Sequence, residues 1–573
     1  MRDTTAGADL LRNEETHTSF FNAEDDLVQK EKAVEFSLSA NGSSKRDLAG
    51  SDDYDCHRLI YGVEDTPPLA MIVIFGLQQV MVCFTGILTI PLLLSHLICV
   101  ADVATRVKFI GSCLVVCGFS TILQTLCGAR LPLLQGPSFA FIPPVVALTK
   151  MPRFMCQEVT NTLNSSSASI DLPNSLTANT TTEAADDEYD IQGGLIATSL
   201  LQMIIGGTGL VGLISKYIGP LTVAPLMILL AISVLPIALK YLISHWISLV
   251  LIVQLIVIAI YLNDVKVPLP YFHSKRRRFV TKKVALFGMF PYIFAIVTTW
   301  LLAVILTTTN TFNHSSDATA RTDAHSDVIA SAPWIRFPYP GQWGVPTFNI
   351  AVTLGMVAGT ISSVVESVGD YIACARVTQQ ALPPPHAVNR GILIEGFSCF
   401  IGGFIGGTTS VTTYSENIGV IGITKVASRW TMVASGVILI FLGLFTKFGA
   451  IMATIPNPLI GGILLISMSM VSGLGLSSIQ NVDLGLTRNM AILGLSISAG
   501  IMIPMAVRQL HIRTGNAVFN DAMELLITTE MMVGGLIGFI LDNTVPGATE
   551  SSVPSVGRTT TESTSLFSLS PVS

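Results

Sequence analysis

Long apolar runs follow one another through most of this chain, and they constrain its fold more than any other feature. Between Thr66 and Thr544 the runs supply about fourteen segments of roughly 20 residues, the length that a helix needs to cross a bilayer. Hydrophobic residues make up 50% of the chain and charged residues 12%, whereas soluble domains carry about 25% charged residues. The sequence therefore predicts an all-α polytopic membrane protein.

The two ends of the chain are polar. Residues 1–65 include "NGSSKRDLAGSDDYD", and residues 545–573 are rich in Ser and Thr. Segments of this composition bury too little apolar surface to fold, so we expect two disordered tails. The N-terminus lacks the basic stretch and short apolar run of a cleaved signal, and we expect the first span to direct insertion.

The loops alternate between basic and polar. Loop 266–283, "KVPLPYFHSKRRRFVTKK", is strongly basic, and basic loops stay in the cytosol. Loops 151–190 and 307–344 are long and polar and carry glycosylation sequons at Asn164, Asn179 and Asn313. These patterns predict a plasma-membrane glycoprotein with both termini in the cytosol.

The predicted spans form two sets of seven. The first set lies near residues 68–95, 106–128, 132–149, 192–215, 219–238, 244–262 and 284–306. The second set lies near residues 346–373, 389–406, 411–424, 430–451, 456–477, 489–507 and 526–542. Because seven is odd, tandem halves of this kind have opposite orientations, and the sequence predicts fourteen transmembrane segments in a 7+7 inverted repeat.

The third segment of each half is too short and too polar for an ordinary helix. In "LPLLQGPSFAFIPPVVAL" the prolines lack a backbone donor, which predicts an extended piece and then a half-helix with Pro137 at its first position and Ser138 just inside. In "GTTSVTTYSENIGVIGIT" a β-prone piece precedes a helix that resumes around Ser415. Paired interrupted spans are the best sequence indication of a transporter's binding site.

Several acidic residues lie in or beside the spans. Glu366 and Asp370 are four residues apart and share a helix face, and Glu416 falls in the first turn of the second half-helix. A charge at the bilayer centre costs at least ~2.5 kcal/mol, so each of these residues needs a partner. A structural hydrogen bond is the alternative to a binding role, and it carries more weight for Glu395 and most for Glu530.

Six motifs carry a resemblance to a known family. They are "LQGPSFAF", "VVESVGDYIACARV", "PPPHAVNRGILIEG", "SENIGVIGITKVASR", "RNMAILGLS" and "TTEMMVGGLIGFILDNTVPG", in this order along the chain. Together they resemble the animal branch of the nucleobase–ascorbate transporter family, over roughly Tyr54 to Gly547. The resemblance implies a core domain (66–218 and 346–452), a gate domain (219–310 and 453–544), an extracellular loop (307–345), elevator-type movement of the core, and a homodimer through the gate.

The family pattern also implies a substrate site. Its contacts match Glu366, Glu416 and the start of the first half-helix, at Ser138, Phe139 and Ala140. Gln79 stands where the family often has histidine. A substrate contact and a structural hydrogen bond between helices are equal alternatives for its role. Asn417, in the same first turn as Glu416, completes the predicted substrate-binding set.

The substrate prediction depends on Glu416. Ascorbate carriers of the family have proline there, whereas "TTYSENIGV" resembles the uracil-type members. Ascorbate is a monoanion, and two nearby carboxylates repel it. A nucleobase instead offers ring N–H groups, to which carboxylates bind strongly. The sequence therefore favours a nucleobase importer, with an ascorbate transporter as the alternative.

The coupling ion is predicted from a second acidic position. Asp370 stands where proton-coupled relatives often have histidine, and we expect it to form a sodium site with Thr409, Ser410 and Thr412. Proton symport is the alternative, and no cofactor other than the coupling ion is expected.

Other function classes fit less well. No basic stripe suggests a nucleic-acid partner, and an anion exchanger is disfavoured by two site carboxylates. No nucleophile motif or metal cluster suggests an enzyme: "GGTGLVG" ends an apolar helix and is explained by close helix packing.

Overall fold

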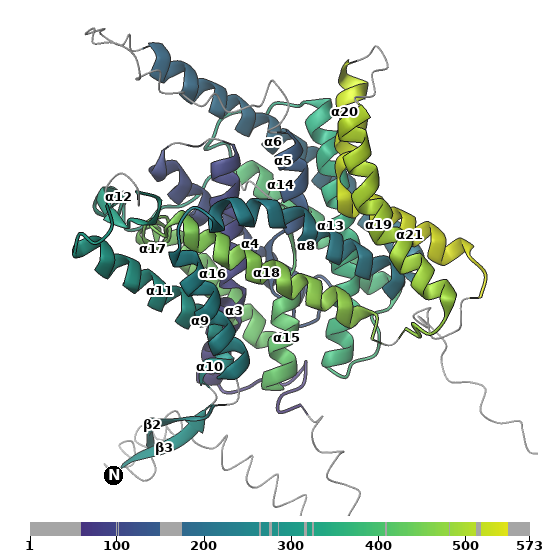
Figure 1. Ribbon diagram of the computed structural model, residues 1–573. Coiled ribbons are helices and arrows are strands. Elements are labelled where there is room, and N and C mark those ends of the chain that lie inside the picture. The colour runs from purple at the N-terminus through teal and green to yellow at the C-terminus, as the bar shows by residue number, and fades with distance from the viewer. Residues whose placement is uncertain are drawn as a thin grey trace, which may run out of the picture.

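The computed structural model describes residues 59–98, 100, 102–148, 175–262, 265–273, 278–284, 286–313, 318–323, 326–406, 410–480, 482–510 and 517–547. Helices make up most of it, and η marks short 3-10 or π turns (Figure 1). In chain order the elements of the first half are α3 (Leu69–Leu97), α4 (Val103–Leu126), β1 (Gln135–Pro137), η3 (Phe139–Phe141), α5 (Ile142–Leu148), α6 (Ser175–Gly207), α7 (Leu210–Ile214), η4 (Ser215–Tyr217), α8 (Pro220–Leu242), α9 (Ile247–Ile256), η5 (Val257–Tyr261), β2 (Val267–His273), β3 (Arg278–Val284), α10 (Leu286–Met289) and α11 (Pro291–Thr308).

The second half repeats this alternation of long and broken helices. After η7 (Ala318–Ala320) and α12 (Ser326–Ser331) come α13 (Ile350–Val377), α14 (Pro385–Ile405), β4 (Val411–Thr413), α15 (Ser415–Thr424), α16 (Arg429–Leu444), α17 (Thr446–Met452), α18 (Asn457–Ser478), α19 (Thr487–Leu510), α20 (Ala517–Thr528) and α21 (Glu530–Thr544). Local sequence explains several ends. Asp102 caps α4 by accepting from the backbone N–H of Thr105 at 3.0 Å. Gly406 is the C-cap of α14, and its φ of +83° suits glycine.

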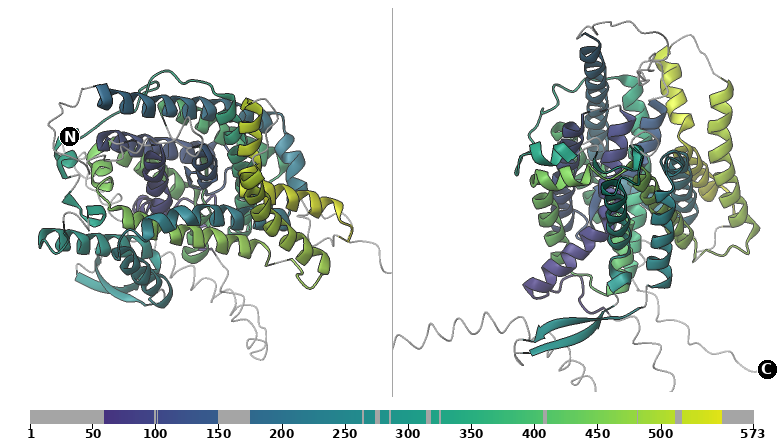
Figure 2. Two further views of the ribbon diagram at one scale, coloured as in Figure 1. Left: turned by 45° about the horizontal axis from the view of Figure 1, so that its top comes forward. Right: turned by 60° about the vertical axis from the view of Figure 1, so that its left-hand side comes forward.

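The structure differs from the predicted loops in two places. α6 begins at Ser175, inside the predicted outer loop 151–190, and residues 149–174 lie outside the described part. Within the predicted basic loop 266–283, β2 and β3 pair as antiparallel strands, which the prediction of an all-α fold did not include. The hairpin stands apart from the helices at one end of the molecule (Figure 2). Both predicted tails lie almost wholly outside the described residues.

Seven described helices are long and apolar enough to cross a membrane, or eight if the bent pair formed by α6 and the α7 segment counts as one span. The other predicted spans coincide with broken or shorter elements, such as α9 with its π turn, α11 and α16. The molecule is therefore a multi-pass membrane protein, and the 7+7 count of fourteen stays a prediction.

Helices of the two halves pack against each other: α4 against α16, α6 against α14, and α8 against α18. The α4–α16 crossing is unusually close because glycines face each other. A Cβ atom on Gly118 would lie 2.4 Å from the carbonyl oxygen of Gly436, and one on Gly443 would lie 2.7 Å from that of Gly111. Small residues of this kind let helix backbones meet directly, as membrane helices often do.

Candidate functional site

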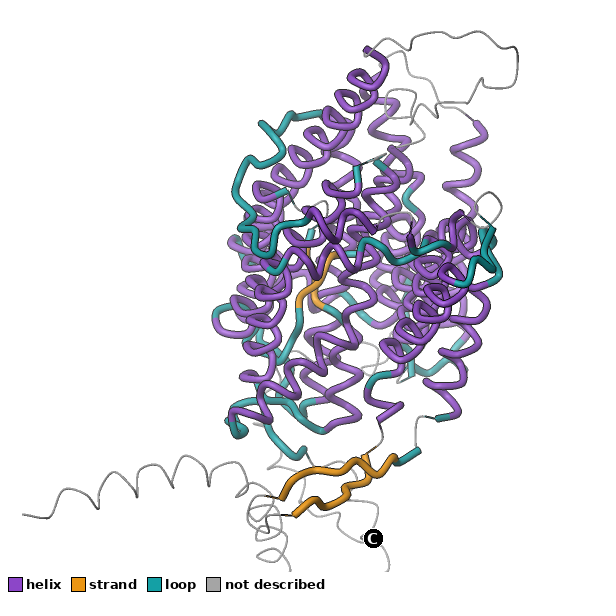
Figure 3. Tube along the Cα trace, turned by 90° about the vertical axis from the view of Figure 1, so that its left-hand side faces the viewer, coloured by secondary structure: helices purple, strands orange, loops and turns teal. Residues whose placement is uncertain are grey.

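The two broken spans meet as a short antiparallel sheet inside the helical body (Figure 3). Gln135 pairs with Thr413, and Pro137 pairs with Val411. The pairing continues on both sides, because the Ser138 N–H donates to Ser410 O at 2.9 Å and the Tyr414 N–H donates to Leu134 O at 3.0 Å. The predicted extended pieces are confirmed. Their backbone groups satisfy each other inside the helical body, as irregular backbone in the interior of a membrane protein requires.

Each extended piece leads into a half-helix. Ser138 is the N-cap of the turn η3, its hydroxyl accepting from the Ala140 N–H at 3.2 Å, and Pro137 belongs to the strand. The prediction that Pro137 starts the helix was therefore wrong by two residues, because η3 begins at Phe139. The second half-helix, α15, begins at Ser415 as predicted, with Glu416 in its first turn and no side-chain cap from Tyr414.

Tyr414 joins the two broken spans through its ring. Its hydroxyl donates to Pro137 O at 2.9 Å. A Cβ atom on Gly136 would lie 2.4 Å from the ring, and one on Gly86 of α3 would lie 2.7 Å from the hydroxyl. Because neither glycine has a side chain, there is room between them for the Tyr414 ring. This role of Tyr414 was not predicted from the sequence. The glycine before Pro137 is the one sequence feature that indicates a close approach of another group there.

α13 brings the predicted acidic pair to this sheet. Glu366 and Asp370 are buried, and Glu366 lies within electrostatic range of Asp370, Glu395 and Glu416. Ser415 donates to Asp370 Oδ1 at 2.6 Å. Among the described residues, Oε2 of Glu366 and Oδ2 of Asp370 have no hydrogen-bond partner. Buried acceptors without partners are costly, so these two oxygens are the strongest indication of a ligand.

Glu395 behaves differently, because its carboxylate is fully engaged. It accepts from Ser367 at 3.0 and 2.9 Å, from the Tyr371 hydroxyl at 3.1 Å and from Thr413 at 2.8 Å. Gln124 on α4 donates in turn to the Tyr371 hydroxyl at 2.6 Å. The network joins α13, α14, α4 and β4, which supports the structural alternative for Glu395. Glu530 lies 3.7 Å from Arg508, at the start of α21.

The described members of the predicted sodium site, Asp370, Ser410 and Thr412, each have a different hydrogen-bond partner. Thr409 lies outside the described residues. Ser410 bonds to Cys399 Sγ at 2.6 Å, and Thr412 bonds to Ser367 at 3.0 Å, on the side of the Glu395 network. Asp370 instead bonds to Ser415. Among the described members of this set, Asp370 is the one with a buried oxygen, Oδ2, that has no hydrogen-bond partner.

The remaining predicted site residues are buried around the half-helix starts. Asn417 donates to Pro132 O at 3.0 Å and so holds the two broken spans together. On α3, Cys83 lies beside the Asn417 backbone N–H and within electrostatic range of Glu416. Gln79, one turn earlier on α3, is buried with its Oε1 lacking a partner among the described residues. Phe139 and Ala140 are buried in η3.

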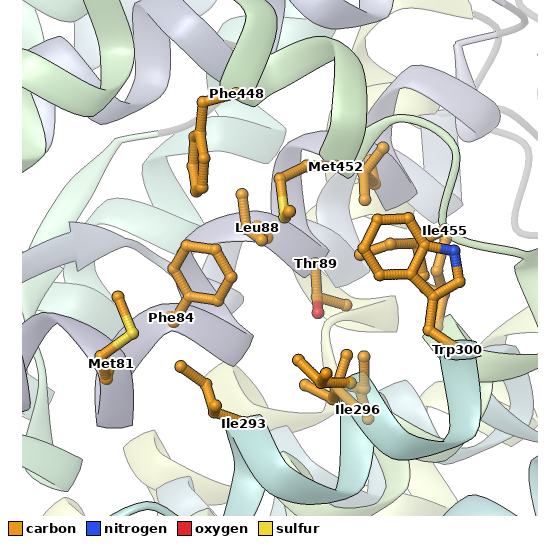
Figure 4. A pocket seen from close by; sticks show the side chains of 14 residues that line it. Met81, Phe84, Leu88, Thr89, Ile293, Ile296, Trp300, Phe448, Met452 and Ile455 are labelled. Atoms are coloured by element: carbon orange, nitrogen blue, oxygen red, sulfur yellow. The ribbon is translucent and has the colours of Figure 1, made fainter. Parts of the chain in front are cut away.

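A separate cavity of about 180 Å³ lies between α3, α11, α17 and α18. Its walls are apolar apart from Thr89, with Phe84 and Trp300 on opposite sides (Figure 4). A polar ligand placed there would lose its hydrogen bonds to water with little in return, so this cavity suits an apolar occupant better than the predicted nucleobase.

The predicted glycosylation sites fall in different surroundings. Asn164 lies outside the described residues, Asn179 lies on α6, and Asn313 is exposed in the loop after α11. Their use stays a prediction.

Comparison with known proteins agrees with these motifs. A family model described as "Permease family" matches residues 70–509. Human solute carrier family 23 member 2 is 39% identical over 516 residues, covering 88% of this chain and 77% of the relative. Mouse solute carrier family 23 member 1 is 38% identical, covering 90% and 85%. Nucleobase-ascorbate transporter 4 of Arabidopsis thaliana is 32% identical, covering 82% and 85%.

Two solved structures show more distant likeness. The murine solute carrier 26 family member A9 anion transporter, inward-facing, is 11% identical with a TM-score of 0.45 and covers 84% of this chain and 76% of that one. The transmembrane domain of the cyanobacterial bicarbonate transporter BicA is 12% identical with a TM-score of 0.44 and covers 84% and 99%. The sequence relatives are transporters and not enzymes. The chain therefore belongs to the nucleobase–ascorbate transporter family.

Proposed function

We propose that the protein imports neutral nucleobases, of the uracil and hypoxanthine or xanthine type, across the plasma membrane by sodium symport. The observation that carries this proposal is the pair of buried carboxylates Glu366 and Glu416, which lie on α13 and at the start of α15. Oε2 of Glu366 lacks a partner among the described residues, so it is ready to accept a hydrogen bond from a ligand.

The chemistry of this pair suits a planar lactam. Carboxylates accept strong charge-assisted bonds from ring N–H groups, and the uncapped start of α15 offers backbone N–H groups to carbonyl oxygens. Phe139 supplies an apolar wall. An ascorbate monoanion would instead meet two negative charges. At an effective dielectric constant of about 20, like charges 4 Å apart repel by about 4 kcal/mol.

For the coupling ion we propose a site centred on Asp370 rather than on the four residues first expected. Its Oδ2 atom is buried without a partner among the described residues, and the Ser415 hydroxyl lies on its other oxygen. Carboxylate and hydroxyl oxygens suit a hard cation. Because Ser415 also opens α15, an ion here touches the same helix start as the substrate.

The transport movement and the assembly are part of the proposal. We expect the core helices that carry the broken spans to move as a body against the gate helices, in an elevator-type movement. Within the predicted gate, only 22% of the 18-residue apolar stretch of α19 is buried inside the molecule. Such a surface faces lipid or a second copy, which supports a homodimer through the gate.

Uptake of labelled uracil, hypoxanthine, xanthine and ascorbate into cells that express the full chain tests the substrate. We expect uracil and the purines to enter and Glu416→Gln to reduce their uptake at least about tenfold, because a charge-assisted bond is lost. Glu524→Gln is the matched control, since Glu524 is an exposed carboxylate on α20. Ascorbate uptake that no nucleobase competes with would establish the alternative substrate.

Replacing external sodium by choline at constant pH tests the coupling. We expect nucleobase uptake to fall to background in choline and to return with sodium. Uptake that persists in choline but collapses when the proton gradient is dissipated would establish proton symport instead.

A further inference from the structure

A small polar cavity of about 80 Å³ lies where the end of α3, the start of α4 and the start of α18 meet the loop after α11. Its polar lining comes from four segments of the chain, and its members are His96, Arg106, Thr319, Arg321, Thr454 and Asn457. It shares Leu92, Ile455 and Ile460 with the apolar cavity of Figure 4. The two cavities therefore follow one seam between α3 and α18.

Arg106 is held in place by residues at the end of α3 and in the loop before α4. Its Nε donates to Val100 O at 2.9 Å, and its Nη1 lies 3.0 Å from His96 Nε2. A guanidinium only donates, so His96 Nε2 accepts and the ring is neutral, with Nδ1–H donating to Leu92 O at 2.8 Å. Among the described residues Nη2 of Arg106 makes no hydrogen bond, which leaves donors for a ligand.

Arg321 reaches the cavity from the loop. Its Nε and Nη2 donate to the Asp323 carboxylate at 3.0 and 2.5 Å, and its Nη1 donates to Phe312 O at 2.6 Å. Its side chain is only 5% exposed, whereas that of Asp323 is 48% exposed. The guanidinium is thus fixed beside the cavity, and its counter-charge faces water.

Among the described residues, no acidic side chain lines the cavity. The carboxylate that pairs with Arg321, Asp323, lies outside the lining. The negative charge of the nearby Asp102 attracts the Arg106 guanidinium. The Asp102 oxygens, however, accept hydrogen bonds from the backbone N–H groups of Ala104 and Thr105 at the start of α4. The 22-residue helix α18 also starts here at Asn457 with no side-chain cap, and its partial positive charge adds to that of the two guanidinium groups.

We propose that this cavity binds a small monovalent inorganic anion, with chloride as the probe, between Arg106 and Arg321. The size of the cavity excludes larger ligands, since a dry cavity that holds a benzene ring measures about 150 Å³. The anion accepts from the free donors of Arg106 and bridges the α3–α4 end to the loop after α11, beside the start of α18. The proposal is independent of which substrate the protein carries.

Thermal unfolding of the purified full-length protein in lipid nanodiscs tests the site. At constant sodium, pH and ionic strength, chloride is titrated against gluconate, which is too large for the cavity. We expect the unfolding midpoint to rise with chloride and to saturate, and bromide to act in the same way. A midpoint that is equal in chloride and gluconate would overturn the proposal.

Variants separate the site from a general salt effect. Arg106→Gln is expected to weaken the apparent chloride affinity by about tenfold or more, since a charge-assisted bond is lost. Lys108→Gln removes a cation two residues further along α4, outside the cavity lining, and is expected to keep the full chloride response. If Arg106→Gln does not fold, Thr319→Glu places a negative charge at the cavity from an exposed loop position. An undiminished chloride response in that variant contradicts the proposal.

Discussion

The hydroxyl of Ser415 donates a 2.6 Å hydrogen bond to Oδ1 of Asp370. This bond connects the first residue of the half-helix α15 to the middle of α13, and it leaves the other oxygen of Asp370 without a protein partner among the described residues. If sodium binds to Asp370, this bond orients the carboxylate for it.

We therefore expect Ser415→Ala to raise the sodium concentration for half-maximal nucleobase uptake. The increase should be about threefold to tenfold, because a hydrogen bond to a charged group contributes about 1 kcal/mol or more. Sodium titration of initial uptake rates measures it. Ser469→Ala, at an exposed serine on α18, is the control, and an unchanged sodium dependence in Ser415→Ala would speak against Asp370 as the ion site.

Glu395 should matter for stability more than for substrate choice. Glu395→Ala leaves the Ser367, Tyr371 and Thr413 hydroxyls without their acceptor, and we expect it to cost about 3 kcal/mol or more of unfolding free energy. Glu395→Gln keeps one acceptor oxygen and should cost less. Thermal unfolding of both variants checks the order. A Glu395→Gln protein that is fully stable but inactive would place Glu395 in the transport cycle.

The space beside Tyr414 gives a steric prediction. A methyl group at Gly136 meets the Tyr414 ring, and the strand pairing gives neither side room to retreat. Gly136→Ala should therefore cost about 1–3 kcal/mol of stability, the usual cost of overpacking. Gly419→Ala on α15 is the control, because a Cβ atom there has nothing within 4 Å. Equal stability of the two variants would contradict the packing described.

The close crossing of α4 and α16 at their glycines gives a second steric prediction, with a larger expected effect. In Gly118→Val the new side chain meets the backbone carbonyl of Gly436, which moves only if the helices separate. We expect the folded fraction, measured by size-exclusion chromatography of the detergent extract, to fall severely. Gly494→Val on α19, where a Cβ atom meets nothing within 4 Å, should retain the wild-type profile.

Asp102 gives a pH dependence at the start of α4. Burial acts to raise its pKa, but hydrogen bonds from Thr105 and Ala104 and the charge of Lys108 outweigh burial, so the pKa lies below its usual value. The stability from this ionised cap is therefore present above the ordinary aspartate pKa and is lost as the pH falls through the lowered one.

Asp102→Ala should lower the unfolding free energy by about 1 kcal/mol at neutral pH, as loss of an N-cap usually does. Asp102→Asn keeps the cap without its charge, so it should retain most of the stability and lose this part of the acid sensitivity. Unfolding midpoints measured across acidic pH distinguish the three proteins. An Asp102→Ala protein as stable as the wild type would show that the cap contributes nothing.

The elements set by local chemistry were predictable from the sequence. Prolines and glycines near Gln135 and the β-prone residues before Ser415 break the spans wherever they lie, so both extended pieces were predicted and are confirmed. The α6 extension from Ser175 and the β2–β3 hairpin were not predicted, because their residues are polar or basic and follow no apolar period.

The site was predictable in its residue types but not in its pairings. Asp370 and Glu395 look alike in sequence, one helix apart, yet one keeps a free oxygen and the other accepts from three hydroxyls. That difference depends on Tyr371, Thr413 and Ser415 approaching from other segments, which spacing along the chain does not show. For the same reason the sequence did not show that Ser410 bonds to Cys399 and Thr412 to Ser367.

The β1–β4 pairing has a consequence for biogenesis. Gln135 and Thr413, which are bonded side chain to side chain, lie 278 residues apart. At about 5–20 residues per second, synthesis leaves the first broken span without its strand partner for some tens of seconds after it has emerged. During that interval its backbone donors and acceptors have no mate within the nascent chain. The insertion machinery must therefore keep the unpaired backbone groups of the first broken span away from lipid until the second half of the chain has been synthesised.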